Sequence, residues 1–159
     1  MKKINLYLLQ SLVLLGGSIF AWWTIYHDFV RFFDKHYVLT NFTDCVVPNP
    51  LATPCFYGGI CFVLALAWSV SIWLNKSAER QRVNQARIWW LLLAGTIFAW
   101  SNFGYQYYKF VQNSFRPTLG CSATIVQTPW QTSCFYGAAI FLTALVVASI
   151  IKFYKNRNR

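Results

Sequence analysis

Long apolar stretches alternate with polar ones four times along the 159 residues of the chain. A helix needs about 20 residues to cross the hydrocarbon core of a bilayer. Four stretches approach or exceed that length with no Asp, Glu, Lys or Arg inside them, namely residues 4–26, 56–74, 88–108 and 135–151. The pattern therefore predicts an all-α, polytopic membrane protein in which four transmembrane helices form a bundle.

The second half of the chain repeats the first. Residues 17–22, GSIFAW, recur as GTIFAW at 95–100, an offset of 78 positions. The tetrapeptide CFYG at 55–58 recurs at 134–137, an offset of 79. A repeat of this length indicates one supersecondary unit that has been duplicated and packed against its copy.

Each copy contains two of the predicted spans. We expect a first two-span repeat over residues 1–75, a polar cytoplasmic loop at 76–87, and a second two-span repeat over 88–159. Two spans per copy make the repeats parallel, unlike the inverted repeats of many transporters. The predicted spans also lack the ionisable residues that pumps and proton relays need. These two observations argue against a transport function.

The composition agrees with a membrane protein. Hydrophobic residues make up 57% of the chain and charged residues 11%, whereas a soluble domain has about 25% charged residues. The net charge of +10 could indicate a nucleic-acid partner, but the basic residues lie between apolar stretches rather than along one solvated face. This placement argues against nucleic acid. The expected partners are the lipid bilayer and a larger membrane complex.

The basic residues also predict the orientation. The two termini and the loop at 76–87 together hold ten of the fourteen Lys and Arg residues. Cytoplasmic segments of membrane proteins carry an excess of basic residues. We therefore expect an integral protein of the cell (inner) membrane, with both termini in the cytoplasm and two longer polar segments on the other side.

Four of the five cysteines fall in those two extracytoplasmic segments, Cys45 and Cys55 in the first and Cys121 and Cys134 in the second. Thiols in an oxidising compartment tend to pair, and the simplest pairing is Cys45–Cys55 and Cys121–Cys134. The other connectivities of four cysteines stay open. Cys55 and Cys134 lie near predicted helix starts, where the helix dipole favours a thiolate. Cys61 lies inside the second predicted span, where a lone cysteine usually packs as a small apolar residue.

This distribution of spans and cysteines resembles disulfide bond formation protein B and, more loosely, the vitamin K epoxide reductase family of four-helix membrane thiol oxidoreductases. The likeness covers the span count, the orientation and the two outer cysteine pairs. The Cys-x-x-Cys motif of these families is missing, because Cys55 is followed by Phe56, Tyr57 and Gly58. The resemblance implies a relay of electrons through the outer cysteines to a membrane quinone, with Cys55 or Cys134 facing the quinone.

Two functions follow from these features. We first expect a non-enzymatic accessory or scaffold subunit with disulfide-stapled extracytoplasmic loops. Each half carries a similar cysteine pair, and two similar pairs suit a structural role better than an electron relay, which needs two unequal pairs. That interpretation needs no cofactor. The alternative is a membrane thiol–quinone oxidoreductase, with quinone as cofactor and with catalytic residues Cys55, Cys134, Cys45 and Cys121. Neither interpretation predicts a metal site.

Overall fold

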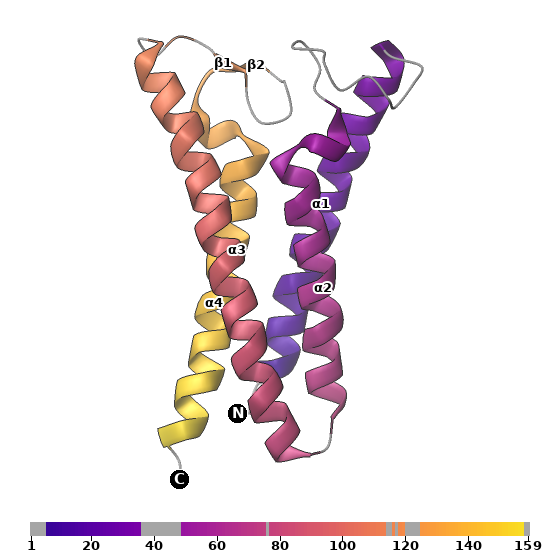
Figure 1. Ribbon diagram of the computed structural model, residues 1–159, viewed down its shortest axis with the longest axis vertical. Coiled ribbons are helices and arrows are strands. Elements are labelled where there is room, and N and C mark those ends of the chain that lie inside the picture. The colour runs from indigo at the N-terminus through magenta and orange to yellow at the C-terminus, as the bar shows by residue number, and fades with distance from the viewer. Residues whose placement is uncertain are drawn as a thin grey trace.

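The computed structural model describes residues 6–35, 49–75, 77–113, 116, 118–119 and 125–157. Within them the chain forms four α-helices, α1 (Leu6–Lys35), α2 (Pro54–Leu74), α3 (Ala78–Gln112) and α4 (Ser133–Arg157). Two 3₁₀-helices precede α2 and α4, namely η1 (Pro50–Ala52) and η2 (Pro129–Gln131). Two-residue strands, β1 (Thr118–Leu119) and β2 (Ile125–Val126), pair antiparallel. Figure 1 shows a long bundle in which consecutive helices run in opposite directions.

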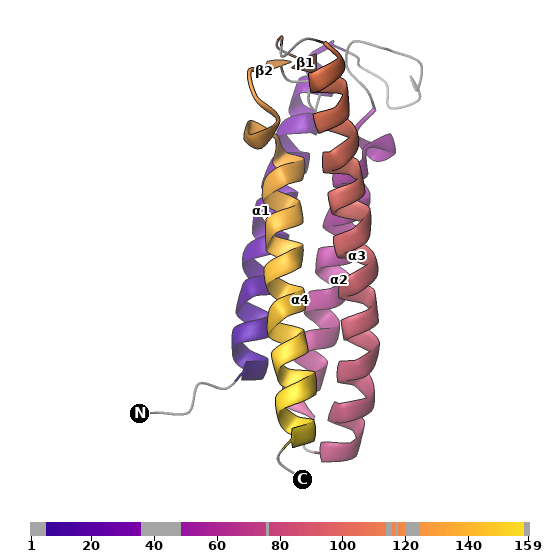
Figure 2. The ribbon, with the colours of Figure 1, turned by 90° about the vertical axis from the view of Figure 1, so that its left-hand side faces the viewer.

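The helices are arranged as a square. Helix α1 packs against α2 and α4, and α3 packs against the same two helices, so α1 faces α3 and α2 faces α4 across the diagonals. We call the end at which α2 and α4 begin the cysteine end. The end at which α1 begins and α4 finishes is the terminal end, at the bottom of Figures 1 and 2.

A threonine sets the start of α2 and of α4. The Thr53 hydroxyl donates to the carbonyl oxygen of Pro50 at 2.7 Å and accepts from the backbone N–H of Phe56 at 3.4 Å. Thr132 makes the same two bonds at the same two distances at the start of α4. Threonine is a favoured N-cap because its oxygen satisfies a backbone N–H that has no partner inside the helix. Both helices therefore begin at a fixed place in the chain.

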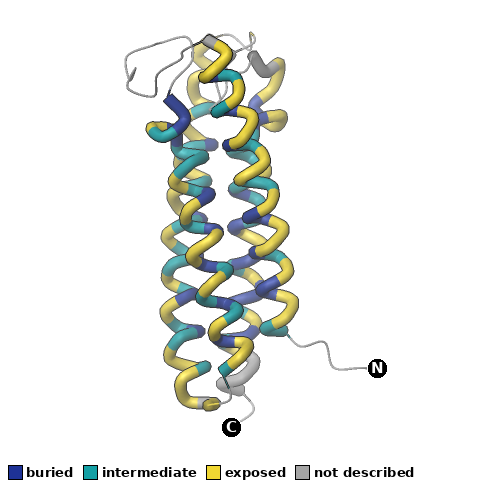
Figure 3. The backbone as a smooth tube through the Cα atoms, turned by 90° about the vertical axis from the view of Figure 1, so that its right-hand side faces the viewer, coloured by how far each residue is buried: buried dark blue, intermediate teal, exposed yellow. Residues whose placement is uncertain are grey.

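The core lies along the axis between the four helices. Figure 3 shows buried positions on the facing sides of the helices and exposed positions on the outside. The buried cluster is aliphatic and aromatic, and it consists of Leu14, Phe62, Ala65, Ile72, Ile88, Leu92, Phe141, Ala144 and Ala148. All four helices contribute to it.

Two glycines let neighbouring helices approach closely. A Cβ atom on Gly17 would lie 2.6 Å from the Phe62 ring, and one on Gly95 would lie 2.7 Å from the Phe141 ring. Gly95 follows Gly17 by 78 positions and Phe141 follows Phe62 by 79, so the same contact is made once in each half. Small residues at such positions are typical of packed membrane helices.

The outer surface of the bundle is apolar, as expected of a membrane protein. Three of the described helices are long and apolar enough to cross a membrane, over Leu6–Asp34, Pro54–Leu74 and Ser133–Phe153. Helix α3 is not one of them, because residues 88–108 mix Trp and Tyr with polar side chains. The helical membrane class is therefore supported, and the fourth span stays a prediction.

The observed helices differ from the expected ones at their ends. The loop expected at 76–87 is helical from Ala78 onward, because its residues continue α3 without a break into the apolar part of that helix. The fourth helix extends past both ends of the predicted 135–151. Helix α1 continues to Lys35, nine residues past the end of the predicted span at residue 26. The strand pair was not expected, since two-residue strands leave no alternating pattern in the sequence.

A matched pair of glycine substitutions tests the packing. Gly17→Ala should lower the free energy of unfolding by about 1–3 kcal/mol, because the new methyl group overlaps the Phe62 ring. Gly16→Ala is the control, since nothing lies within 4 Å of its Cβ position. Thermal unfolding in detergent micelles measures both. Equal melting temperatures for the two variants would contradict the described packing.

Candidate functional site

Cys55 and Cys134 meet at the cysteine end of the bundle. Their Sγ atoms are 3.9 Å apart although the residues are 79 positions apart in the chain. This distance exceeds the length of a disulfide bond, about 2.05 Å, so the two sulfurs are in contact without being bonded to each other. Each is the second residue of its helix, α2 for Cys55 and α4 for Cys134. The contact therefore joins the two halves across a diagonal.

An apolar pocket lies beside the two sulfurs, with a cavity volume of about 60 Å³. Both cysteines line it, and all four helices contribute. Each lining residue from the first half has its repeat equivalent in the lining, at the offsets of 78 or 79 found in the sequence. Five of these eight pairs are identical, namely Phe20/Phe98, Ala21/Ala99, Cys55/Cys134, Gly58/Gly137 and Phe62/Phe141.

The stacked rings of Phe62 and Phe141 close the pocket on the side of the core. Their centroids are 4.0 Å apart and their planes differ by 24°. Both rings are buried and belong to the core cluster as well as to the pocket lining. The site is therefore bounded by two diagonal contacts between α2 and α4, one between sulfurs and one between rings.

The remaining three pairs make the two sides of the pocket unequal, and they are Thr24/Asn102, Pro54/Ser133 and Gly59/Ala138. The Thr24 hydroxyl donates to the carbonyl oxygen of Phe20 at 3.0 Å. The Asn102 amide donates to the carbonyl oxygen of Phe98 at 2.8 Å, and it carries a second N–H and a carbonyl oxygen as well. The second half therefore offers more hydrogen-bonding groups to the pocket.

Aromatic rings cluster more densely around Phe135, which follows Cys134 in the chain, than around Phe56, which follows Cys55. Trp130 of η2 lies 5.1 Å from Phe135 and 5.3 Å from Phe103, measured between ring centroids. The repeat equivalents of Trp130 and Phe103 are Leu51 and Ile25, so the first half lacks these two rings. The two halves therefore differ in the side chains near each cysteine, although the cysteine pairs have similar spacing in the sequence.

The structure brings together two of the four predicted site cysteines. Cys45 and Cys121 lie outside the described residues, so the pairings Cys45–Cys55 and Cys121–Cys134 stay predictions. Cys61 packs against the core cluster and is not part of the pocket lining. Among the described residues, no group of three or more His, Cys, Asp or Glu side chains is placed to hold a metal ion.

The contact between Cys55 and Cys134 was not predicted from the sequence. The signal for it was present, because parallel repeats related by a twofold axis along the membrane normal place equivalent core residues opposite each other. The chain matches no family model, no curated protein and no solved structure. The site is therefore interpreted from its own geometry.

Cross-linking tests the contact between the sulfurs. In a variant that keeps only Cys55 and Cys134, mild oxidation should form a bond between them, because 3.9 Å separates their Sγ atoms. Mass spectrometry of non-reduced peptides measures the product. The control keeps only Cys61 and Cys134, since Cys61 lies about 9 Å further along α2. Equal yields in both variants, or none in either, would disagree with the described geometry.

Proposed function

We propose that this protein is a membrane thiol–disulfide oxidoreductase, in which Cys55 and Cys134 pass electron pairs between the two predicted cysteine pairs and a quinone in the apolar pocket. The observation that carries the proposal is the 3.9 Å distance between the two Sγ atoms. Two disulfides that only staple their own halves do not require their sulfurs to meet. A relay between two pairs requires such a contact.

The proposed topology places the sulfurs on the oxidising side of the membrane. Helix α3 packs between α2 and α4, both of which are apolar and long enough to span. We therefore propose that α3 also crosses the bilayer, so that both termini lie in the cytoplasm and the cysteine end faces away from it. The excess of basic residues at the termini and in 76–87 supports this orientation.

The sulfur contact permits thiol–disulfide exchange. A thiolate of one pair attacks a sulfur of the other pair's disulfide, so one S–S bond forms as another breaks and the displaced sulfur leaves as a thiolate. This first step leaves a mixed disulfide between the two pairs, and the second thiolate of the attacking pair then displaces it. The attacking pair ends as a disulfide and the other pair as a dithiol, so two electrons have moved without an outside oxidant. Cys55 and Cys134 are well placed for it, because each lies in the first turn of a helix, where the helix dipole stabilises a negative sulfur.

The size and apolar lining of the pocket support a quinone as its occupant. Its volume of about 60 Å³ exceeds several times the roughly 10–15 Å³ that holds one water molecule, and its lining is almost entirely apolar. A quinone supplies an acceptor for two electrons and two protons, which balances the oxidation of a dithiol to a disulfide. Asn102 and Ser133 are the groups that could donate hydrogen bonds to a ring carbonyl.

The difference between the two halves supports a relay. A relay needs one pair that accepts electrons from substrate and another that passes them on. Asn102 replaces Thr24 in the pocket lining, and Trp130, which packs on Phe135 next to Cys134 in the chain, replaces Leu51. These replacements make the two cysteines chemically distinct although the backbone around them is matched.

The second candidate is the non-enzymatic accessory subunit with stapled loops. The matched threonine caps and the five identical pocket pairs favour it, because a structural pocket has no need for unequal halves. The two candidates differ in what the cysteines do during turnover. An activity measurement with cysteine variants separates them.

Cysteine variants test the proposed activity. Cys55→Ser and Cys134→Ser should each reduce dithiothreitol-dependent reduction of a short-chain ubiquinone to the rate without protein, because each removes one side of the exchange. Absorbance of the quinone measures the rate for protein in nanodiscs. Cys61→Ser is the control and should retain the wild-type rate. An inactive wild type, or active Cys55 and Cys134 variants, would favour the accessory subunit.

A swap across the pocket tests the proposed quinone site. Asn102→Thr should raise the KM for quinone about fivefold, because one hydrogen bond contributes about 1 kcal/mol. The double variant Asn102→Thr and Thr24→Asn should restore most of the affinity, since these positions are repeat equivalents in the same lining. Steady-state kinetics measure both. An unchanged KM in the single variant would remove Asn102 from the proposed site.

A further inference from the structure

Two glutamines form a buried contact near the terminal end of the bundle. The Gln85 Nε2 atom of α3 donates to the Gln10 Oε1 atom of α1 at 2.9 Å. The side chains are buried, with exposed fractions of 0% for Gln10 and 3% for Gln85. The bond spans the diagonal between α1 and α3, whereas the sulfur contact spans the diagonal between α2 and α4 at the other end.

One hydrogen bond leaves each amide with an unused group. Gln10 Nε2 and Gln85 Oε1 are buried, and no described residue bonds to either atom. A buried amide without its full set of partners costs free energy, because it has lost its bonds to water. The unused groups are complementary, an NH₂ group that donates and a carbonyl oxygen that accepts, and they flank the same hydrogen bond.

Packing alone does not call for these polar residues. The repeat equivalent of Gln10 is Ile88, which is fully buried in the core cluster. The Ser69 hydroxyl lies 2.9 Å from that of Ser11 beside the glutamines, and the equivalent of Ser69 is the buried Ala148. The same core positions are therefore apolar in the second half. The polar groups of Gln10 and of Gln85, which lies in the second half, leave one donor group and one acceptor for a ligand that forms hydrogen bonds.

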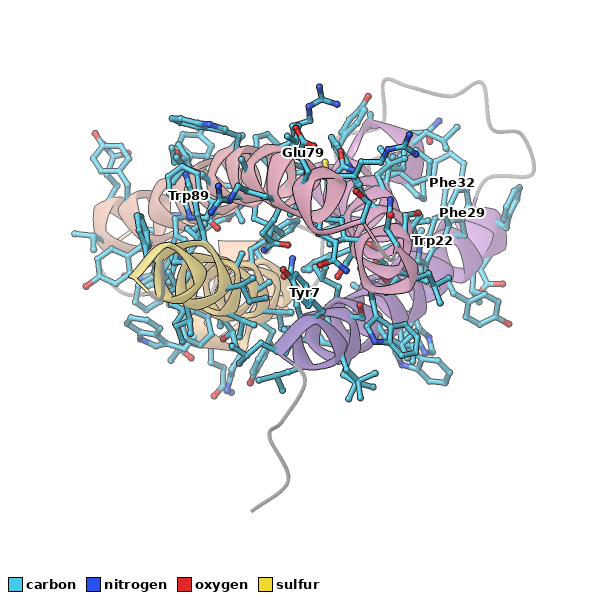
Figure 4. All side chains as sticks on the ribbon, turned by 90° about the horizontal axis from the view of Figure 1, so that it is seen from below. Tyr7, Trp22, Phe29, Phe32, Glu79 and Trp89 are labelled. Carbon is cyan, nitrogen blue, oxygen red and sulfur yellow. The ribbon has the colours of Figure 1, made fainter. Side chains whose placement is uncertain are left out.

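The glutamines lie near the terminal end of the bundle. Gln10 is four residues from the start of α1, or about 6 Å along the helix axis. Tyr7, one turn closer to that end, lies on the side of α1 that faces the other helices (Figure 4). The described groups that bond within the cluster are amides and hydroxyls, with no charged side chain among them. These uncharged hydrogen-bonding groups suit a small neutral ligand rather than an ion.

We propose that Gln10 and Gln85 bind one ordered water molecule. The water accepts a hydrogen bond from Gln10 Nε2 and donates one to Gln85 Oε1, so it closes a ring of three hydrogen bonds with the bond already present. Buried waters typically occupy sites with two to four polar partners. The site is independent of the proposed redox function, because it lies on the other side of the Phe62–Phe141 stack.

Nuclear magnetic resonance on the intact protein tests the water site. The full chain, with ¹⁵N-labelled glutamine, is placed in lipid nanodiscs, and dipolar magnetisation transfer from water to the side-chain amides is recorded. Gln10→Ile and Gln85→Leu variants assign the two signals. Gln81 is the internal comparison, since its amide already donates to the backbone carbonyl oxygens of Ile72 and Asn75.

The expected result is a strong dipolar transfer from water to the Gln10 amide and its loss in the Gln85→Leu variant, which removes one of the two anchors. Absence of transfer at Gln10 would overturn the proposal, as would transfer from lipid protons instead. A shift to two reciprocal amide bonds, seen as protection of both amides without water contact, would also overturn it. As a second measurement, the double variant Gln10→Ile and Gln85→Leu should melt at a higher temperature than either single variant.

Discussion

The stacking of Phe62 on Phe141 is the contact on which the rest of the structure depends. It joins α2 and α4 across one diagonal of the bundle, whereas each of these helices otherwise packs against α1 and α3. The rings fit only because Gly17 and Gly95 leave space beside them. Above the stack lie the pocket and the two sulfurs, and below it lies the aliphatic core that ends in the glutamine pair. A single aromatic contact thus separates two regions of different chemistry.

The sequence predicts the helices well because their cause is local. Apolar runs of membrane length bounded by polar residues predict α2 to within two residues. They also predict where α1 and α4 begin, but both helices continue past the apolar run, to Lys35 and Arg157. The start of α3 was misplaced, since residues 78–87 are polar and their helical form depends on continuity with the apolar helix that follows. The contact between Cys55 and Cys134 could not be located from spacing within one half, because it depends on how the two halves pack.

The two halves differ in ways that the repeated motifs conceal. The identical segments determine the backbone, including the Pro-x-x-Thr turns before α2 and α4. The differences lie at isolated positions, where Asn102, Trp130 and Gln10 stand opposite Thr24, Leu51 and Ile88. A comparison of the two halves in sequence therefore reveals mainly the segments that give them the same backbone. Chemical asymmetry becomes visible only when these positions are seen to gather around the pocket and the axis.

The matched lining of the pocket has a consequence for how such a site changes through mutation. Its walls are encoded twice, in two stretches of the gene that mutate independently. A single substitution changes one wall only. The two walls can therefore become different from each other in small steps, while the unchanged wall keeps its original contacts. To exchange the properties of the two walls, both residues of an equivalent pair must change. Directed evolution of this protein is therefore best carried out on such pairs.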